Sequence, residues 1–572
     1  MTIREYTRWR SESVKCRDSM RATFSSAFLR GEERAVRFLP ADFRDPAARR
    51  QAAERAARRP QPVSPELLAA LREQEQTLSP SAARKANLEA LAQPGTAVVV
   101  TGQQVGLFLG PLYTFYKAAS AIAFARQLQA ETGVRCVPLF WLQTEDHDFE
   151  EIRRCHSPAP DGTSLELALE PGGSDESQTR ISVAHRRLGS EITGQLEALE
   201  EALGRLPHAG PMLALLREHY RPGQSLGLAF AGVLSALFAD EGLLFLNPRC
   251  AAIAKLAAPI YRRSIVEADQ IAAVLQARSA ALCAVGFDEQ VAVRPGTTLV
   301  FFHDSVDGPR YRLERSRDQW TTPHARSGGA GEPLSNEELL AILDRQPLRF
   351  STSALLRPIV QDTLLPTAAY VGGPGELNYF AQLQPLYELF GVAQPLAVLR
   401  ARFRCIEENT QALLRKLGLH ASDAELPRAE LLRRLSAQLL DKVAEMACDG
   451  APLAPEAVRA WLLDEVEQRL TQLGEKQSGL RDAVQRTRVS IERNVNRLVG
   501  RYERILLERD QTLSERVDRL QHALLPAGVP QERHYALPYF IGKYGIQGFK
   551  QQVLGSLEAT GLATAGVREL EL

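Results

Sequence analysis

Two short apolar runs, each ending in a cluster of polar side chains, constrain the fold of this chain most strongly. The first run, Val98–Val100, leads into Thr101-Gly102-Gln103-Gln104. The second run, Val137–Leu142, contains Trp141 and leads into Gln143-Thr144-Glu145-Asp146-His147-Asp148. The stretch Gly110–Leu128 between them has the spacing of an amphipathic helix, which predicts a strand–helix–strand crossover in a parallel α/β sheet. Ligands bind beyond the carboxyl ends of such strands, so both polar clusters are candidate sites.

Length and charge narrow the possible functions. The chain has 572 residues, too many for one hydrophobic core, and carries 69 basic and 69 acidic residues. With no net field to favour nucleic acid or an anionic membrane, we expect small-molecule or protein partners. No apolar run approaches the roughly 18 residues of a membrane span, and the amino terminus lacks a secretion signal. These features predict a cytoplasmic protein.

The pattern divides the chain into three parts. Residues 1–395 are predicted to form the α/β core, with helices before the sheet and insertions at about 157–225 and 285–345. The second insertion reads as an antiparallel meander because short alternating runs are separated by turns. Residues 396–530 are predicted to be helical almost without interruption from Ala401 onward. Residues 531–572 are unusually aromatic for a tail and are expected to pack on the body.

A seam of spacings three and four within the helical part indicates a coiled coil. Its members are Leu470, Leu473, Gln477, Leu480, Val484, Thr487 and Ile491, and the rhythm resumes at Val495, Leu498, Tyr502 and Ile505. Two interpretations stay open. The seam could join two chains in a homodimer, or it could pack within one chain against residues 401–450 as an antiparallel hairpin.

The first candidate site follows the first strand. Thr101, Gly102, Gln103 and Gln104 precede a glycine-containing loop, and Pro111 suits the first position of the next helix. Free N–H groups at a helix start attract phosphate or carboxylate. Tyr113 and Lys117 lie four apart on one helix face and could both reach the same ligand. The alternative is a structural turn with a surface lysine.

The second candidate site is the acidic cluster after the second strand. Crowded carboxylates shift each other's pKa, and His147 beside them is a candidate general base. The carboxylates could instead bind an ammonium group. The spacing matches neither a His-Glu-x-x-His motif nor a calcium loop, so no metal is predicted. The alternative is a solvated acidic helix start, which fits Glu150 and Glu151 best.

A glycine-rich segment and an aromatic segment complete the set of candidate sites. Gly372-Gly373-Pro374-Gly375-Glu376 precedes a predicted helix and could cradle a phosphate or carboxylate, or serve only as a tight helix entry. It is neither a Walker loop nor a dinucleotide fingerprint. Near the carboxyl end, Tyr539, Phe540 and Lys543 could hold a nucleotide base, or could simply pack on the body.

Taken together, these segments resemble the bacillithiol synthase family in order and spacing across nearly the whole chain. The resemblance rests on Thr101-Gly102-Gln103-Gln104 with Gly110-Pro111-Leu112-Tyr113-Thr114, on Phe140-Trp141 with Glu145-Asp146-His147-Asp148, and on Gly372-Gly373-Pro374-Gly375-Glu376. It implies a Rossmann-like core similar to class I aminoacyl-tRNA synthetases and nucleotidyltransferases, with connecting-peptide insertions and a dimerising carboxyl-terminal coiled coil. It also implies a ligase that joins cysteine to glucosaminyl malate in the last step of bacillithiol biosynthesis.

The implied chemistry is the formation of a carbon–nitrogen bond, with ATP or another adenine nucleotide as the expected cosubstrate. In this hypothesis Glu145, Asp146 and Asp148 hold the amine groups and His147 is the base. Thr101, Gln103, Gln104, Tyr113 and Lys117 orient a carboxylate or phosphate, and the segment Gly372–Glu376 closes the pocket. The synthetase signatures His-Ile-Gly-His and Lys-Met-Ser-Lys-Ser are absent from the sequence. The alternatives are a non-catalytic nucleotide-binding coiled-coil scaffold and a nucleotidyltransferase with another acceptor.

Overall fold

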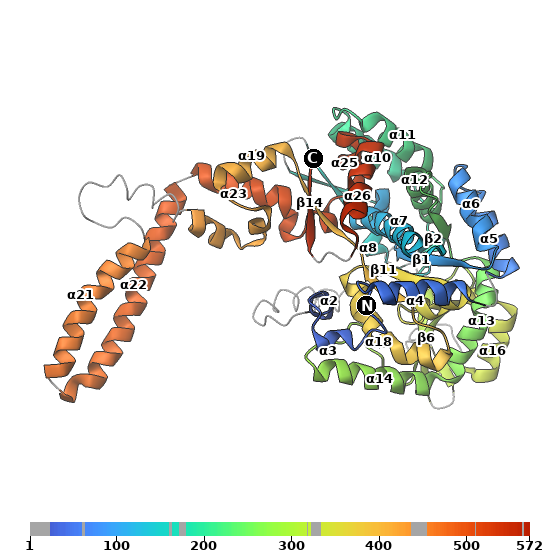
Figure 1. Ribbon diagram of the computed structural model, residues 1–572, viewed down its shortest axis with the longest axis horizontal. Coiled ribbons are helices and arrows are strands. Elements are labelled where there is room, and N and C mark those ends of the chain that lie inside the picture. The colour runs from blue at the N-terminus through green and yellow to red at the C-terminus, as the bar shows by residue number, and fades with distance from the viewer. Residues whose placement is uncertain are drawn as a thin grey trace. The chain divides into compact units, whose positions relative to one another are not determined.

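Five parallel strands form the central sheet (Figure 1). They are β1 (Thr96–Gln103), β2 (Arg135–Leu142), β5 (Leu244–Leu246), β11 (Thr367–Gly372) and β12 (Leu396–Leu399). Their order is β12-β11-β1-β2-β5, and every neighbouring pair is parallel. Counted along the chain, this is the order 3-2-1-4-5 of a Rossmann sheet. The prediction of a Rossmann-like α/β core is confirmed.

Helices cover the sheet and explain why its strands are continuous apolar runs. Residues 96–102 of β1 are all buried, as expected for a parallel strand shielded on both faces. The long helix α7 (Tyr113–Thr132) packs on β1 and β2, and α4 (Pro46–Ala57) packs beside α7 on β1 and β11. α6 (Ala82–Leu91) contacts β1, β2 and β5.

In this computed structural model the described residues are 23–59, 63–159, 163–170, 179–316, 319–321, 333–435, 455–476, 478–509, 511–562 and 566–572. They divide into two compact units. The first comprises the described parts of Met1–Pro160, Ser164–Phe403 and Tyr535–Arg568. The second comprises those of Asp161–Thr163, Arg404–His534 and Glu569–Leu572. Most of the aromatic tail thus belongs to the same unit as the sheet.

The other helices and strands of the first unit precede the sheet, lie within the two insertions, or link its later strands. The helices are α2 (Phe24–Leu29), α3 (Glu33–Val36), α5 (Pro65–Glu75), α8 (Phe149–Ile152), α10 (Glu191–Leu203), α11 (Ala209–His219), α12 (Leu226–Leu237), α13 (Ala251–Val266), α14 (Ala268–Ala284), α16 (Asn336–Arg345), α17 (Arg357–Leu364), α18 (Pro374–Phe390), α25 (Leu537–Tyr544) and α26 (Ile546–Thr560). The first insertion also holds a hairpin of β3 (Arg154–Pro158) and β4 (Ser164–Ala168).

The second insertion forms its own antiparallel sheet, as the alternating runs predict. Its strands are β6 (Thr297–His303), β7 (Arg310–Ser316), β8 (Gln319–Thr321), β9 (Leu334–Ser335) and β10 (Phe350–Thr352). The strand order is β10-β6-β7-β8-β9.

The second unit has a small apolar core and a helical hairpin. Its helices are α19 (Glu408–Leu417), α21 (Pro455–Lys476), α22 (Arg481–Arg509), α23 (Gln511–Leu524) and α24 (Gln531–His534). The buried core includes Leu414, Leu431, Val517 and Leu520. The strands β13 (Arg402–Ile406) and β14 (Val567–Glu571) lie where the chain passes between the units.

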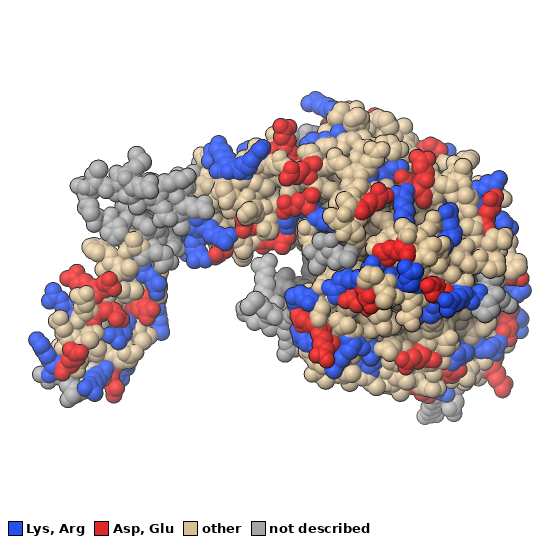
Figure 2. Space-filling model, in the orientation of Figure 1, with Lys and Arg blue, Asp and Glu red and all other residues tan. Residues whose placement is uncertain are grey.

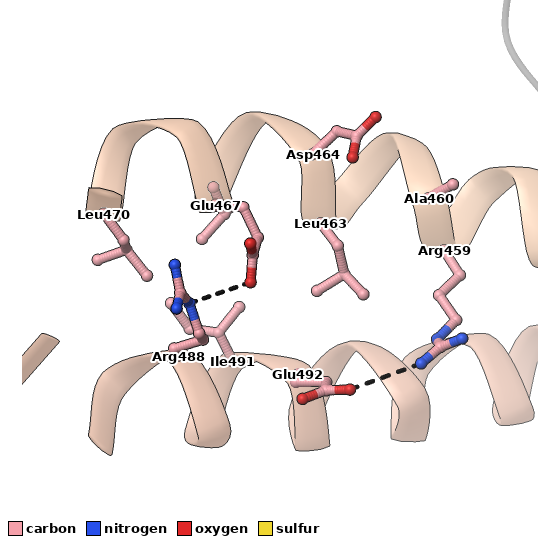
Figure 3. A pocket seen from close by; sticks show the side chains of 10 residues that line it. Arg459, Ala460, Leu463, Asp464, Glu467, Leu470, Arg488, Ile491 and Glu492 are labelled. Atoms are coloured by element: carbon pink, nitrogen blue, oxygen red, sulfur yellow. Dashed lines mark ion pairs between the residues drawn. The ribbon is translucent and has the colours of Figure 1, made fainter. Parts of the chain in front are cut away.

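The coiled-coil seam is split between two helices of one chain. α21 ends at Lys476, the turn Ser478–Leu480 follows, and α22 returns antiparallel to α21. Figure 3 shows the ion pairs that join them, Arg459 with Glu492 at 3.6 Å and Arg488 with Glu467 at 3.0 Å. An antiparallel hairpin therefore exists. In the described residues the partner of α22 is α21 and not the stretch 401–435; residues 436–450 of the predicted partner lie outside the described residues.

Three further sequence predictions need correction. The seam cannot be one continuous helix through Leu480, because the chain turns there; Gln477 lies outside the described residues. Residues after Ala401 begin with the strand β13, whose Phe403 and Cys405 are buried, and not with a helix. The helix after β1 starts at Tyr113 and not at Pro111, because Gly110 has a φ of 61° and Pro111 bridges to Ala536.

Charge is mixed over the surface. On the face drawn in Figure 2, acidic and basic side chains are interspersed among the described residues, without a broad patch of one sign. A search of the described helices finds none with the length and apolarity needed to span a bilayer.

Candidate active site

The three polar segments come together at the carboxyl edge of the sheet. β1 and β2 run in register from Thr96 and Arg135 to Gln103 and Leu142, so their polar extensions leave the sheet side by side. On the other side of β1, β11 ends at Gly372. From β1 the chain first adds β2 and β5 on one side of β1, and later adds β11 and β12 on the other side. The gap between β1 and β11 is therefore the topological switch point, where ligands of such sheets bind.

A buried ion pair between Lys117 and Glu376 spans the switch point. Lys117 lies on α7, the helix after β1, and Glu376 lies on α18, the helix after β11. The Lys117 ammonium also donates to the Gly102 carbonyl at 2.8 Å and to Gln103 Oε1 at 2.9 Å. Burial lowers the pKa of Lys117, although Glu376 opposes this shift. The residue is not the surface lysine of the alternative interpretation.

The glycine-rich segment starts α18 but does not leave a free anion cradle. The Gly373 N–H donates at 2.8 Å to Glu376 Oε2, and Tyr370 donates to the other oxygen of the same carboxylate. Burial alone would raise the pKa of Glu376, yet Lys117 and the Gly373 N–H outweigh it and hold it low. The carboxylate of Glu376 thus fills the position predicted for a ligand. Gly375 faces open space, with no atom within 4 Å of a Cβ placed on it.

Two arginines, Arg357 and Arg400, also lie beside this segment. Arg357 is buried and donates to Gln361 at 2.7 Å and to the Tyr379 hydroxyl at 2.9 Å. The Arg400 guanidinium lies 5.5 Å from the centre of the Tyr113 ring. Gln103 Nε2 lies 3.5 Å from the Tyr113 hydroxyl, so Tyr113 belongs to the same cluster.

Gln104 and Asp146 connect the first segment to the second. Gln104 Nε2 donates at 2.8 Å to Asp146 Oδ2, and Arg310 Nη1 donates at 3.0 Å to Asp146 Oδ1. Burial tends to raise the pKa of Asp146, but Arg310 and His147 overcome this, so the pKa is lowered and the group is a carboxylate. Its side chain is still 38% exposed and can meet a ligand. Gln104 Oε1 is buried and has no hydrogen-bond partner among the described residues.

His147 lies between Asp146 and Arg310. Its Nδ1 is 3.2 Å from Arg310 Nη1 and 3.5 Å from Asp146 Oδ1, and its ring centre is 6.3 Å from that of Phe301. Burial and the positive charge of Arg310 lower the pKa of His147 to about 3. The imidazole is therefore neutral at physiological pH.

The other three carboxylates of the cluster differ in environment. Glu145 is buried and accepts hydrogen bonds from the hydroxyl and the backbone N–H of Thr352. Asp148 caps α8, and burial together with the charge of Asp146 raises its pKa. Desolvation by its neighbours, reinforced by the charges of Asp148 and Asp146, raises the pKa of Glu151 to about 7, although Glu151 is an exposed residue. Glu151 can thus exchange a proton near neutral pH.

Three predicted site residues serve the sheet itself. Thr101 is fully buried and donates its hydroxyl to the Val371 carbonyl at 2.7 Å. Trp141 is buried in β2 opposite Gly102. A Cβ on Gly102 would lie 2.8 Å from the Trp141 carbonyl oxygen, so this glycine permits the close approach of the two strands.

The aromatic tail packs against the first unit. Phe540 is 2% exposed and packs on Phe549, whose ring in turn contacts Phe115. A nucleotide base cannot stack on Phe540 without displacing these rings. Tyr539 is partly exposed, with the Lys543 ammonium 5.9 Å from its ring centre.

The sequence pattern did not predict Arg310 as a site residue, and it favoured Glu151 as part of a solvated helix start. Arg310 enters from β7 in the second insertion, and its position beside Asp146 depends on long-range folding that no local pattern reveals. For Glu151 a signal existed, because it follows the acidic cluster within one helical turn. Among the residues that the structure describes, no group of three or more His, Cys, Asp or Glu side chains is arranged to hold a metal ion.

Two family models match the chain. One is described as Bacillithiol biosynthesis BshC, N-terminal Rossmann-like domain, and covers residues 10–401. The other is described as Bacillithiol biosynthesis BshC, C-terminal coiled-coil domain, and covers residues 403–558. This chain belongs to the BshC family. The family boundary at 401–403 coincides with the border between the two units.

Relatives in this family match most of the chain. A protein of Koribacter versatilis is 35% identical over 81% of this chain and 82% of its own length. Proteins of Salinibacter ruber and Solibacter usitatus are 33% and 32% identical, covering 89% and 84% of this chain and 89% and 85% of their own lengths. All three are named "Putative cysteine ligase BshC".

A solved structure from Campylobacter jejuni, described as a "putative arginyl t-RNA synthetase", covers 81% of this chain and 100% of its own. It is 10% identical to this chain, with a TM-score of 0.22. Similarity this low carries no argument, and the likeness to class I synthetases stays a prediction.

Proposed function

We propose that this protein is a cysteine ligase that forms an amide bond between the carboxyl group of cysteine and the amine of glucosaminyl malate, the last step of bacillithiol biosynthesis. The observation that carries the proposal is the gathering of Gln104, Asp146 and Lys117 around the carboxyl end of β1 in a BshC-family Rossmann sheet. The names of the relatives support the ligase class.

The acidic side of the site suits an amine. Asp146 is ionised and partly exposed, Asp148 and Glu151 lie in the same cluster, and Gln104 Oε1 offers an unused acceptor. An amine N–H donates to such oxygens, and an amine must lose a proton when it becomes an amide. Glu151, with a pKa of about 7, can accept that proton. Glu145 already accepts hydrogen bonds from Thr352 and is buried.

The lysine side of the site suits the carboxyl component. Lys117, Gln103 and Tyr113 lie together, and Gly375, one residue before Glu376, faces open space. An anion can bind here only if it displaces or shares the Lys117–Glu376 pair. In their present arrangement these residues do not fit a nucleotide phosphate, because Glu376 already occupies Lys117 and the Gly373 N–H.

We further propose that ATP or another adenine nucleotide is the cosubstrate that activates the carboxyl group. Tyr539 and Lys543 form the second candidate place for a nucleotide. A Tyr539→Ala variant that binds ATP as the wild type does would remove Tyr539 from that role. Calorimetric titration of both proteins with ATP measures this directly.

We also propose a homodimer formed through the coiled-coil hairpin. Trp461 is 60% exposed and Leu498 is 58% exposed on α21 and α22, and Leu473 and Val489 are also exposed. Large apolar side chains gathered on one hairpin favour association with another protein surface.

The experiment that tests the function is mass spectrometry of the purified protein incubated with cysteine and glucosaminyl malate, with and without ATP. We expect the cysteinyl conjugate, with AMP and pyrophosphate or ADP and phosphate identifying the activation route. An Asp146→Asn variant should lose product, while Glu197→Gln, an exposed change on α10, should retain it. Absence of product under every condition, with folded protein, would contradict the proposal.

A further inference from the structure

The environment of His147 determines which of its ring nitrogens carries the proton. Arg310 Nη1 lies 3.2 Å from His147 Nδ1, within hydrogen-bond distance. A guanidinium has only donors and no acceptor, so Nδ1 must accept this hydrogen bond through its lone pair. In a neutral imidazole with a lone pair on Nδ1, the proton is on Nε2. Among the described residues Nε2 has no protein partner, and the side chain is 21% exposed.

Arg310 is held firmly enough to impose this arrangement. It is 4% exposed; its Nε donates to the Ser351 hydroxyl at 3.1 Å, and Nη2 donates to the Thr352 carbonyl. Its guanidinium carbon lies 3.8 Å from the centre of the Phe301 ring. Nη1 then reaches both Asp146 and His147. This network crosses from the antiparallel insertion to the end of β2.

The charged groups that face His147 act in opposite directions on its charge. Arg310 and Arg180 oppose a positive charge on the imidazole, while Asp146 favours one, and burial adds to the opposition. The balance keeps the ring neutral across the physiological range. Because His147 Nδ1 accepts a hydrogen bond from Arg310, it has no proton to donate to Asp146 as the histidine of a catalytic triad does.

We infer that Arg310 is a positioning residue that locks His147 as the neutral Nε2–H tautomer, so that His147 acts as a hydrogen-bond donor to the substrate carbonyl oxygen and not as a general base. The inference rests on the proposed function for the identity of the carbonyl, which is the activated carboxyl of the acid component. It replaces the base role that the sequence predicted. A neutral histidine used as an electrophile is an established catalytic device.

The reaction step balances with this role. The amine lone pair forms the new C–N bond while the carbonyl π pair moves to oxygen, and the His147 Nε2–H donates a hydrogen bond to that oxygen without giving up its proton. The electron pair on oxygen then re-forms the carbonyl π bond. The bond from the carbonyl carbon to the leaving group breaks, and the leaving group departs with the bonding electrons. The amine proton passes to a carboxylate such as Glu151. Removing one such donor typically lowers turnover by about 100 to 1,000 fold.

The test is nitrogen NMR of the full-length protein labelled with ¹⁵N-histidine, with His147→Gln used to assign the His147 signals. We expect an unprotonated Nδ1 and a protonated Nε2 that do not change between pH 5 and pH 8. A proton on Nδ1, or a titration of His147 within that range, would overturn the inference whether or not the protein proves to be a ligase. Because this measurement uses the wild type, it does not depend on an Arg310 variant folding.

Variants then separate positioning from general stability. The Arg310→Lys variant keeps the positive charge but loses the several N–H donors of the guanidinium. In this variant we expect His147 to show a mixture of tautomers or to titrate. His208→Gln, an exposed histidine change in the same unit, should leave the His147 signals unchanged. In the product assay His147→Gln, which retains an N–H donor, should keep at least tenfold more turnover than His147→Ala. Equal activity of the two variants would contradict the donor role, and absence of product from the wild type would contradict the proposed function instead.

Discussion

The Lys117 ammonium and the Glu376 carboxylate form a buried ion pair that joins the helix after β1 to the helix after β11. Both groups have further partners: Lys117 donates to the Gly102 carbonyl, and Glu376 accepts from the Gly373 N–H. Because each charge is satisfied on several sides, the pair holds the two halves of the Rossmann sheet together at the place where a ligand should bind.

Breaking this pair should destabilise the first unit. Removing one partner leaves a buried charge without compensation, so Lys117→Met should lower the free energy of unfolding by about 3 kcal/mol. Chemical denaturation monitored by circular dichroism measures the change. The double variant Lys117→Met/Glu376→Gln should recover part of the loss. If the two single changes are simply additive, the pair is not coupled in the way the structure indicates.

Two glycine substitutions should separate packing from ligand access. Gly102→Ala places a Cβ 2.8 Å from the Trp141 carbonyl oxygen and should cost about 1 to 3 kcal/mol of stability. Gly375→Ala meets no atom within 4 Å and, inside a helix, should be neutral or stabilising by up to about 1 kcal/mol. If the substrate lies against Gly375, the Gly375→Ala variant should stay folded but form less product. A strongly destabilised Gly375→Ala would show that the space beside α18 is not open.

Glu151 should make stability depend on pH in a definite direction. Its folded pKa of about 7 is above its ordinary value of 4.5, so folding favours the protonated form. The stability contribution of protonated Glu151 is present at acid pH and is lost as the pH rises through 7. Glu151→Gln should therefore raise the melting temperature at pH 8 more than at pH 5.

The matched control is Glu197→Gln, an exposed glutamate on α10. It should shift the melting temperature equally at both pH values. The same result for Glu151→Gln would contradict the raised pKa. Since Glu151 is exposed, added salt should weaken the difference between the two pH values.

The exposed apolar face of the hairpin should control association. Trp461→Arg introduces a charge at a 60% exposed apolar position and should shift the proposed dimer toward monomer. Size-exclusion chromatography with light scattering reports the mass at several protein concentrations. Arg469→Gln, at a position 77% exposed on the same helix, is the control and should leave the mass unchanged. A wild-type protein that is monomeric at every concentration would refute dimerisation.

Local patterns were sufficient for β1, β2 and the polar segments that follow them, but not for β11 and β12, which no pattern predicted. The run Val98–Val100 predicts a buried strand because every residue in it is apolar and β-branched, and the structure places it at the centre of the sheet. The same reasoning located the polar ends of β1 and β2, while the glycine-rich segment after β11 was predicted only as a turn before a helix. It failed at Ser478–Leu480, where a short turn interrupts a helical rhythm that continues on both sides.

The sequence by itself determined the α/β core and the three polar segments, because strand and helix periodicity are properties of neighbouring residues. Only the tertiary structure decided their partners. Arg310 reaches Asp146 from another sheet, and Glu376 meets Lys117 across the switch point. These contacts join residues far apart in the chain, and they set the pKa values and the available donors of the site. Burial and charge act through space, which is why His147, predicted from its neighbours as a base, lies in surroundings that keep it neutral.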